Sequence, residues 1–311
     1  MQKQVIILAG PTAVGKTDAA IHLATHFSEL HPPTVSQSAI PILSADSRQC
    51  YRELHIGVAK PTAEQRKLVP HYFIDTHSIT DDVNAAVFER YALDTLQDLF
   101  RTVDRVIVVG GTGLYLRALM QGLDEMPVIP GEIRQEIESQ YRSKGLYSLQ
   151  EAIRKEDPQY AQDADLNNPQ RLIRALEVVR ATGKSIRHFQ QSRKPEREFA
   201  MIRIALDLPR EELYQRINKR VDLMMKQGLL EEVKSLLLYK HLNALQTVGY
   251  RELFDYLEGN MKLPEAIDKI KQHTRNYAKR QMTWFRADPS WKWFHPDDLD
   301  GIIHAVKSYD M

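Results

Sequence analysis

Several features are scarce in this sequence, and each absence narrows what the protein can be. The 311 residues include a single cysteine, Cys50, which excludes an internal disulfide and a cysteine-cluster metal site. No apolar run approaches the length of a membrane span, and the N-terminal stretch MQKQVIILAGP is too short for a signal-peptide core. These absences favour a soluble globular protein of the cytoplasm.

An excess of one charge is also missing, because 42 Lys and Arg balance 41 Asp and Glu. Hydrophobic residues make up 43% of the chain and charged residues 27%, which is typical of a folded protein and not of a disordered one. The length allows two domains, or one domain with a sizeable insertion. A monomer is the default expectation.

The clearest motif is GPTAVGKT, which matches the phosphate-binding pattern G-x-x-x-x-G-K-[ST] at every fixed position. It follows the apolar run VIILA and precedes a helical pattern from Lys16 to Phe27, as the motif requires. Backbone amides and the helix N-terminus attract phosphate oxygens there, Lys16 reaches the outer phosphate, and Thr17 is placed to hold magnesium. The predicted phosphate site comprises Gly10, Pro11, Thr12, Ala13, Val14, Gly15, Lys16 and Thr17.

Strand and helix patterns alternate in the first third of the chain, as in a parallel sheet with crossover helices. The runs PILSAD, RVIVV and AMIRIALDL predict further strands, and helical patterns separate the last two. We therefore expect an α/β fold, in which a P-loop parallel-sheet core flanked by helices carries an inserted all-helical domain. The expected core is residues 1–119 and 199–311, the insertion is residues 120–198, and residues 31–41 form an exposed loop.

Asp46 ends the run PILSAD, at the carboxyl edge of a strand expected to neighbour the phosphate loop. Sheets of this class bind their ligands at that edge. A carboxylate there can be a magnesium ligand, a general base beside a substrate, or the N-cap of the following helix. Its position alone leaves all three roles open.

Two further residues are candidates for the same edge. Thr112 follows RVIVVGG at another helix N-terminus, although a glycine turn after a buried strand also serves packing. Arg220 lies beside Ile217 and Met224 on the apolar face of the helical pattern ELYQRINKRVDLMM. A guanidinium in that position needs an anion, which is either an internal carboxylate or a bound diphosphate.

Positive charge is concentrated in two segments, residues 171–197 and residues 269–286. Tyr277, Trp284 and Phe285 interleave with the second as stacking or core groups. A basic helix is often only a solvated surface, but two such segments in a protein with a phosphate loop favour RNA. The basic residues of the first segment are Arg171, Arg174, Arg180, Lys184, Arg187, Arg193, Lys194 and Arg197.

Taken together, the motifs give a resemblance that covers nearly the whole chain: the sequence resembles bacterial tRNA dimethylallyltransferases. The blocks that carry it are GPTAVGKT, ADSRQCYRELHIGVAKPT, PHYFID, VVGGTGLYLRAL, NNPQRLIRALEV, TVGYRE and RNYAKRQMTWFR. The resemblance implies transfer of a dimethylallyl group from dimethylallyl diphosphate to the exocyclic N6 amine of adenosine 37 in tRNA. It also implies release of diphosphate and assistance from Mg2+.

The resemblance further implies roles for single residues. Asp46 matches the general base, Thr12 and Arg220 match residues that bind and activate the diphosphate, and the loop segment from Thr12 to Thr17 holds that diphosphate. The positions that match tRNA contacts are Asp46, Ser47, Arg48, Gln49, Thr112, Arg134, Gln170, Arg171, Leu172, Ile173, Arg174, Gln246, Gly249, Tyr250 and Arg251. Cys50 matches no required residue and is expected to be incidental.

The implied chemistry agrees with the residues. An adenine amine is a poor nucleophile, so a carboxylate that accepts its proton helps the new bond to form, while cations neutralise the departing diphosphate. Reaching that amine in an anticodon stem-loop requires taking the base out of its stack.

Three other functions remain as alternatives. An adenylate dimethylallyltransferase would prenylate free AMP, ADP or ATP, but a free nucleotide needs no extended basic surface. A P-loop small-molecule kinase or nucleotide hydrolase would carry a second magnesium-binding Asp after an apolar strand, where RVIVVGG ends in glycine. The third alternative is an RNA-binding protein with a regulatory nucleotide site.

Overall fold

A computed structural model describes residues 2–30, 40–190 and 195–309. The chain divides into two compact units, one of Met1–Met120 with Glu196–Met311 and the other of Gln121–Pro195. Most of the loop expected at residues 31–41 lies outside the described residues. Within the described part of the chain, no helix combines the length and the apolar character needed to cross a membrane.

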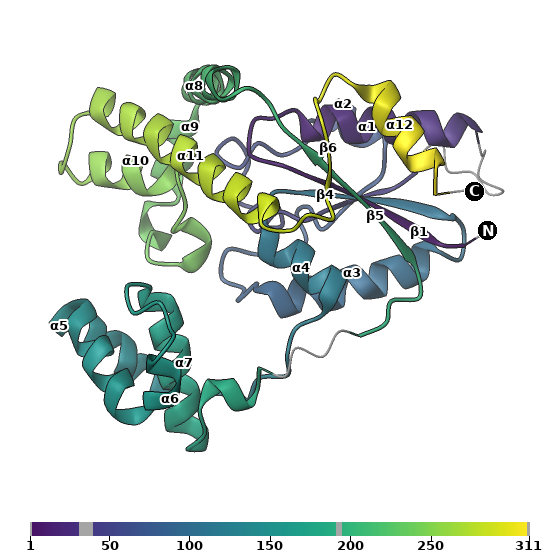
Figure 1. Ribbon diagram of the computed structural model, residues 1–311. Helices are drawn as coiled ribbons and strands as arrows, with labels where there is room; N and C mark the ends of the chain where they lie inside the picture. The colour runs from purple at the N-terminus through teal and green to yellow at the C-terminus, as the bar shows by residue number, and fades with distance from the viewer. Residues whose placement is uncertain (1, 31–39, 191–194, 310–311) are drawn as a thin grey trace. The chain divides into compact units, whose positions relative to one another are not determined.

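The first unit is built on a six-stranded sheet in which every strand pair is parallel. The strand order is β3-β2-β4-β1-β5-β6 (Figure 1). The predicted parallel α/β sheet is therefore confirmed, with more strands than the sequence patterns alone indicated. The strands are β1 Gln4–Ala9, β2 Ile42–Ser44, β3 His71–Tyr72, β4 Arg105–Gly110, β5 Ala200–Leu206 and β6 Lys292–Phe294.

One predicted adjacency is wrong. The strand that ends near Asp46, β2, does not neighbour β1, because β4 lies between them. Most residues of β1 and β4 are buried, as expected for central parallel strands covered on both faces. The turn after β4 therefore lies between the phosphate loop and Asp46.

Alternate residues of β1 enter two different hydrophobic cores, because successive side chains point to opposite faces of a sheet. Val5 and Ile7 pack with the helices α3 (Ala85–Leu99) and α4 (Gly113–Gln121). Ile6 and Leu8 belong to the cluster that includes α1 (Lys16–Leu30) and α12 (Leu299–Lys307), and Figure 1 shows α1 and α12 close together. The two cores fix the sheet from both sides.

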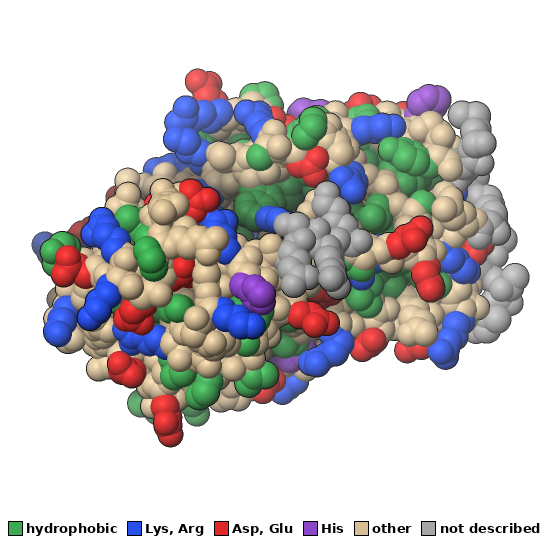
Figure 2. Space-filling view, turned by 60° about the horizontal axis from the view of Figure 1, so that its bottom comes forward, with side chains coloured by type: hydrophobic (Ala, Val, Ile, Leu, Met, Phe, Trp, Pro, Cys, Tyr) green, Lys and Arg blue, Asp and Glu red, His purple; other side chains and the backbone are tan. Residues whose placement is uncertain are grey.

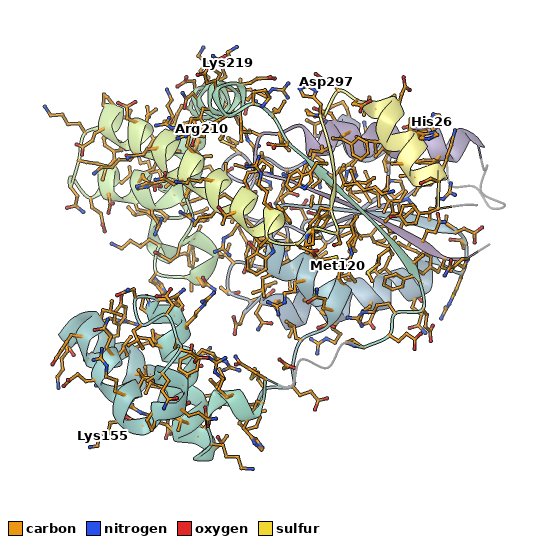
Figure 3. The ribbon with its side chains drawn as sticks, in the orientation of Figure 1. His26, Met120, Lys155, Arg210, Lys219 and Asp297 are labelled. Carbon is orange, nitrogen blue, oxygen red and sulfur yellow. The ribbon has the colours of Figure 1, made fainter. Side chains whose placement is uncertain are left out.

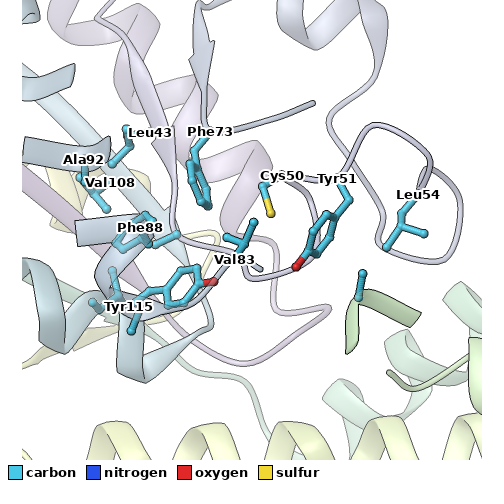
Figure 4. Packing of buried hydrophobic residues seen from close by; sticks show 14 of the residues in the cluster. Leu43, Cys50, Tyr51, Leu54, Phe73, Val83, Phe88, Ala92, Val108 and Tyr115 are labelled. Atoms are coloured by element: carbon cyan, nitrogen blue, oxygen red, sulfur yellow. The ribbon is translucent and has the colours of Figure 1, made fainter. Parts of the chain in front are cut away.

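The single cysteine belongs to the first of these cores. Cys50 is fully buried and lies among aromatic residues that include Phe73 and Tyr51 (Figure 4). Phe88 and Tyr115 stack nearby with ring centroids 4.5 Å apart. Burial raises the pKa of the Cys50 thiol to about 12, with Asp46 adding to the effect, so this thiol stays protonated at neutral pH.

Most of the remaining helices of the first unit lie between β5 and β6 in the chain. The first of these is α8, and Gly228 follows it with a φ of 100°, which a glycine adopts without strain. The remaining helices and 3₁₀ turns of this unit are α2 Ala63–Leu68, α8 Arg210–Lys226, α9 Leu229–Ser235, η2 Leu237–Tyr239, η3 Asn243–Leu245, α10 Tyr250–Leu257 and α11 Leu263–Arg286.

The described part of the second unit contains only helices, which are α5 Gly131–Glu156, α6 Pro158–Ala161, α7 Pro169–Thr182 and η1 Ile186–His188. α5 is kinked at Gly145, whose φ of 70° is left-handed. Its core joins α5 to α7 through residues such as Ile137, Leu149 and Leu176. This unit therefore has a hydrophobic core of its own.

Candidate active site

A cavity of about 680 Å³ lies at the carboxyl edge of the sheet in the first unit. It is lined by the phosphate loop from Thr12 to Thr17 except Val14, by the turn from Asp46 to Gln49, and by Arg220 of α8. Parallel strands bring their carboxyl ends to one edge, which is why residues so far apart in the sequence meet here. Further lining residues from the C-terminal part of the chain are Gln246, Gly249, Arg251, Thr274, Tyr277, Arg280 and Gln281.

The phosphate loop turns tightly around Lys16. Its Nζ donates to the backbone oxygens of Gly10, at 3.0 Å, and Pro11, at 2.6 Å. Gly10 has a φ of 147°, and a Cβ there would lie 2.8 Å from the backbone oxygen of Leu206, so the position requires glycine. Of the predicted loop residues, Val14 points into the hydrophobic core, so its side chain makes no ligand contact.

The pKa of Lys16 is well below its ordinary value. Burial, together with the positive charge of Arg220, lowers the pKa of Lys16 to about 7, although Asp46 acts in the opposite direction. A multiply charged anion bound in this loop would favour the protonated amine. The loop is therefore electrostatically suited to a diphosphate.

Asp46 caps the turn that follows it. Its Oδ1 accepts hydrogen bonds from the backbone N–H groups of Arg48, at 2.8 Å, and Gln49, at 3.2 Å. The capping role, one of the three open roles of this carboxylate, is thus present on Oδ1. No hydrogen bond to Oδ2 occurs among the described residues, and the side chain lines the cavity, so Oδ2 is available to a substrate.

Arg220 enters the cavity from the inward face of α8, next to the buried Ile217 and Val221. Lys219, its neighbour in sequence, projects from the outer side of the same helix (Figure 3). Nη1 of Arg220 donates to Oγ1 of Thr12 at 3.4 Å. Burial lowers the pKa of Arg220 and Asp46 raises it, yet no carboxylate in the described part of the chain forms an ion pair with it. The geometry favours the bound-anion alternative over an internal salt bridge.

The cavity also has an apolar wall. The apolar side chains that line it come from α8, from the residue that begins α9, from α11 and from two loops; they are Val58, Ile217, Val221, Met224, Leu229, Val248 and Ile270. A cavity that joins a phosphate loop to an apolar wall suits a ligand with an anionic head and a hydrocarbon tail. Motif analysis did not find this wall, because its members come from five segments with no shared pattern.

The turn after β4 connects the phosphate loop to the Asp46 turn. Thr112 accepts a hydrogen bond from the backbone N–H of Ser47 at 3.2 Å. Gln281 of α11 accepts one from the Thr12 N–H at 2.9 Å and donates one to the Gly111 oxygen at 2.9 Å. Sequence reasoning did not single out Gln281; the only signal was its place in the block RNYAKRQMTWFR.

Some residues predicted to contact tRNA are not accessible through their side chains. Tyr250 is fully buried and its hydroxyl donates to Glu232 at 2.5 Å. In the second unit, Leu172 and Ile173 are buried in the hydrophobic core. These three side chains therefore lie in a core and not at an accessible surface, because their helices turn them inwards.

The other predicted residues of the second unit divide into two kinds. Arg134 and Arg174 both form ion pairs with the buried carboxylate of Glu177, at 2.8 and 3.1 Å. Glu177 therefore neutralises part of the positive charge that these arginines would offer to RNA. Gln170 and Arg171 are exposed at the first turn of α7. Residues 170 and 171 are therefore the freest of this group to meet a partner.

The two basic segments carry less available charge than their composition suggests. In the second segment, Lys269, Lys271 and Arg286 form ion pairs with Glu265, Asp222 and Asp207. Figure 2 shows Lys and Arg interspersed with Asp and Glu on the face it displays. Ion pairs also hold Arg174, Arg180, Arg187 and Arg197 of the first segment, while Arg193 and Lys194 lie outside the described residues.

Comparison with known proteins gives one family. The model of the IPP transferase family matches residues 49–288. The chain is 45% identical to tRNA dimethylallyltransferase 1 of Bacteroides thetaiotaomicron, over 98% of this chain and 96% of that protein. It is 44% identical to the tRNA dimethylallyltransferase of Cytophaga hutchinsonii, over 99% and 98% of the two chains.

Solved structures are similar as well. The full-length tRNA isopentenylpyrophosphate transferase of Bacillus halodurans has a TM-score of 0.68 and 34% identity, and the match covers 99% of this chain and 98% of that one. A eukaryotic dimethylallyltransferase acting on tRNA has a TM-score of 0.71 and 28% identity, covering 91% of this chain and 69% of that one. The similarity thus extends over both units.

Proposed function

The chain belongs to the IPP transferase family, and from this premise we propose that it transfers a dimethylallyl group from dimethylallyl diphosphate to tRNA. It is a tRNA dimethylallyltransferase, a prenyltransferase that modifies tRNA. The acceptor is the exocyclic N6 amine of adenosine 37, and diphosphate is released. The protein acts as a monomer in the cytoplasm.

One observation carries the proposal: a single cavity combines the phosphate loop, Arg220 and Asp46 with an apolar wall. Lys16 and Arg220 supply positive charge for a diphosphate, and side chains such as Met224 and Ile270 can cover a five-carbon tail. The cavity therefore favours a prenyl donor.

The reaction forms a bond between N6 of adenosine and C1 of the dimethylallyl group and breaks the bond between C1 and the diphosphate oxygen. Negative charge grows on the leaving diphosphate, and Lys16 and Arg220 neutralise it. The amine loses a proton, which Oδ2 of Asp46 accepts. The hydrogen bonds at Oδ1 hold the carboxylate in place for that transfer.

Mg2+ is the proposed cofactor. The Thr17 hydroxyl lines the cavity, whereas the described residues contain no group of three or more His, Cys, Asp or Glu side chains that could hold a metal. Mg2+ often binds through one or two protein oxygens together with substrate phosphates and water, so this sparse donor set fits it. When bound, it supplies further positive charge for the leaving diphosphate.

The anticodon stem-loop of tRNA is the proposed partner. The three residues that directly follow the general base Asp46 also line the cavity; they are Ser47, Arg48 and Gln49. An unstacked adenine would be recognised there. Gln246, Gly249 and Arg251 line it from another segment. Gln170 and Arg171, with the ion-paired Arg134 and Arg174, are the proposed contacts of the second unit, and Thr112 acts through the Asp46 turn.

A transfer assay tests the function. The protein is incubated with carbon-labelled dimethylallyl diphosphate, Mg2+ and either an unmodified tRNA transcript or AMP, and ATP hydrolysis is measured in parallel. We expect label in tRNA, none in AMP, and no ATP consumption. Label in AMP alone would indicate an adenylate dimethylallyltransferase, and ATP consumption without transfer would indicate a kinase or hydrolase.

A further inference from the structure

The side chain of Gln281 joins two loops of the active site. It comes from α11 and is only 6% exposed. Its Oε1 accepts from the N–H of Thr12, and its Nε2 donates to the oxygen of Gly111, both at 2.9 Å. The amide oxygen thus accepts a hydrogen bond and the amide nitrogen donates one, as their chemistry requires. No other side-chain type of this length offers one donor and one acceptor in that way.

The turn after β4 is shaped to admit this helix. A Cβ at Gly111 would lie 2.2 Å from Nε2 of Gln281, and a Cβ at Gly113 would lie 2.2 Å from Nε1 of Trp284. The Thr112 side chain lies close enough to the Tyr277 hydroxyl to counter part of the rise that burial causes in the pKa of Tyr277. Because Tyr277, Gln281 and Trp284 are four and three residues apart, they share one face of α11. This face of α11 packs along the turn from Gly111 to Gly113.

The contacts of Gln281 lead to residues of the reaction. Thr12 forms two side-chain contacts: its backbone N–H donates a hydrogen bond to Gln281, and its hydroxyl accepts one from Arg220. Since the N–H is engaged, the hydroxyl is the group that Thr12 presents to the cavity. On the other side of the amide, the turn that contains Gly111 also carries Thr112, which binds the turn after Asp46.

We propose that Gln281 is a positioning residue for the diphosphate site. Its two hydrogen bonds fix the Thr12 N–H relative to the Gly111 oxygen. This constraint sets the direction of the Thr12 hydroxyl and the position of the first residues of the phosphate loop. It touches no reacting atom, and its effect passes through Thr12. This inference rests on the proposed function, because it takes the ligand of the loop to be dimethylallyl diphosphate.

Two substitutions separate positioning from packing. Gln281→Met keeps the length of the side chain but removes both hydrogen bonds, and Gln281→Glu keeps the acceptor but loses the donor and adds negative charge near the diphosphate. Gln272→Met is the matched control, because it makes the same chemical change at an exposed position of the same helix. The readouts are the KM values for both substrates, calorimetric binding of inorganic diphosphate, and the thermal unfolding midpoint.

We expect Gln281→Met to raise the KM for dimethylallyl diphosphate and the Kd for diphosphate by about tenfold, with the KM for tRNA changed less than about twofold. Gln281→Glu should weaken diphosphate binding more, and Gln272→Met should match the wild type. A Gln281→Met enzyme with wild-type diphosphate affinity would overturn the inference, as would equal losses for both substrates. If Gln281→Met did not fold, wild-type affinity in Gln281→Glu would overturn it equally.

Failure of the proposed function would look different. In that case the wild-type protein itself would transfer no label from dimethylallyl diphosphate to tRNA. Diphosphate binding by the wild type together with unchanged binding by both Gln281 variants would overturn only the role of Gln281.

Discussion

The charges of three residues dominate the site: Lys16 and Arg220 face one carboxylate, Asp46. Two buried cations against one anion leave positive charge to be neutralised by a ligand. Their positions follow from the fold, since the loop after β1, the end of β2 and the inner face of α8 all meet at one edge of the sheet.

The base assignment makes a prediction at Asp46. Asp46→Asn keeps an oxygen that can cap the turn at residues 47–50 but removes the proton acceptor. We expect kcat to fall by about 100-fold or more, with tRNA and diphosphate affinity within a few fold of wild type. Single-turnover transfer and filter binding measure the two quantities. Loss of tRNA binding with an unchanged single-turnover rate would show that Asp46 serves recognition and not proton transfer.

The lowered pKa of Lys16 predicts that the affinity for diphosphate depends on pH. Its pKa is lowered to about 7 by burial and by Arg220, so the amine is mostly neutral above that pH. A bound diphosphate raises this pKa, and the complex then holds more protons than the separate partners. Binding at pH 8.5 should therefore take up about one proton, and affinity should fall as pH rises above 7.

Calorimetry in buffers of different ionisation enthalpy measures this uptake. The control is Lys16→Arg, which keeps a permanent charge because a guanidinium does not deprotonate in this range. That variant should take up no proton from this position. Equal uptake by wild type and Lys16→Arg would assign the linked proton to another group.

Several site residues could be predicted from the sequence because local motifs carry them. Lys16, Thr17 and Asp46 stand at fixed places in a loop or at a strand end, and Arg220 stands out as a charge on an apolar helix face. Gln281 could not be found in this way, because its partners lie 269 and 170 positions away. The burial of Tyr250, Leu172 and Ile173 could not be predicted either, since tertiary packing decides how a helix is oriented.

At the scale of elements, sequence patterns predicted β1, β2, β4 and β5, as well as the helices α1 and α8, because apolar runs and helical periodicity are local. The order of the strands in the sheet could not be predicted in this way, because it depends on contacts between segments that are far apart in the sequence. The interposition of β4 between β1 and β2 brings Gly110 against Ala45, the residue before Asp46.

This close approach predicts the effect of Gly110→Ala. The added Cβ would lie 2.2 Å from the backbone oxygen of Ala45, so β2 or β4 must move. We expect the free energy of unfolding to fall by about 2 kcal/mol or more and activity to be lost, as measured by urea denaturation and transfer assay.

Gly111→Ala is the matched comparison. Its Cβ would lie 2.2 Å from Nε2 of Gln281, a side chain that can move, and 3.2 Å from the backbone oxygen of Gly10. That variant should lose less stability but show the raised KM for dimethylallyl diphosphate expected of Gln281→Met. Equal destabilisation by the two substitutions would contradict this account of the turn.

At the scale of the whole molecule, the two basic segments pointed correctly to an RNA substrate but overstated the available charge. Lys271 is held by Asp222 at 2.6 Å, whereas Lys279 is exposed and has no ion pair among the described residues. Only basic groups that release counterions from the RNA contribute to the salt dependence of binding.

We therefore predict different salt effects for two lysines of α11. Lys279→Ala should reduce the slope of log affinity against log salt by about 1, and Lys271→Ala should change it much less. Equilibrium tRNA binding between low and physiological salt measures both slopes. The same reduction in both variants would mean that the Lys271 ion pair opens when tRNA binds.

The central claim is that the phosphate loop holds a leaving group and that Asp46 receives the proton of the attacking amine. The most direct measurement uses dimethylallyl diphosphate labelled with 14C in the prenyl group and 32P in both phosphates, incubated with wild-type protein and unmodified tRNA. The account predicts 14C at N6 of adenosine 37 and an equal amount of 32P released as intact diphosphate. Label from phosphate in the RNA, or release of single phosphates, would contradict it.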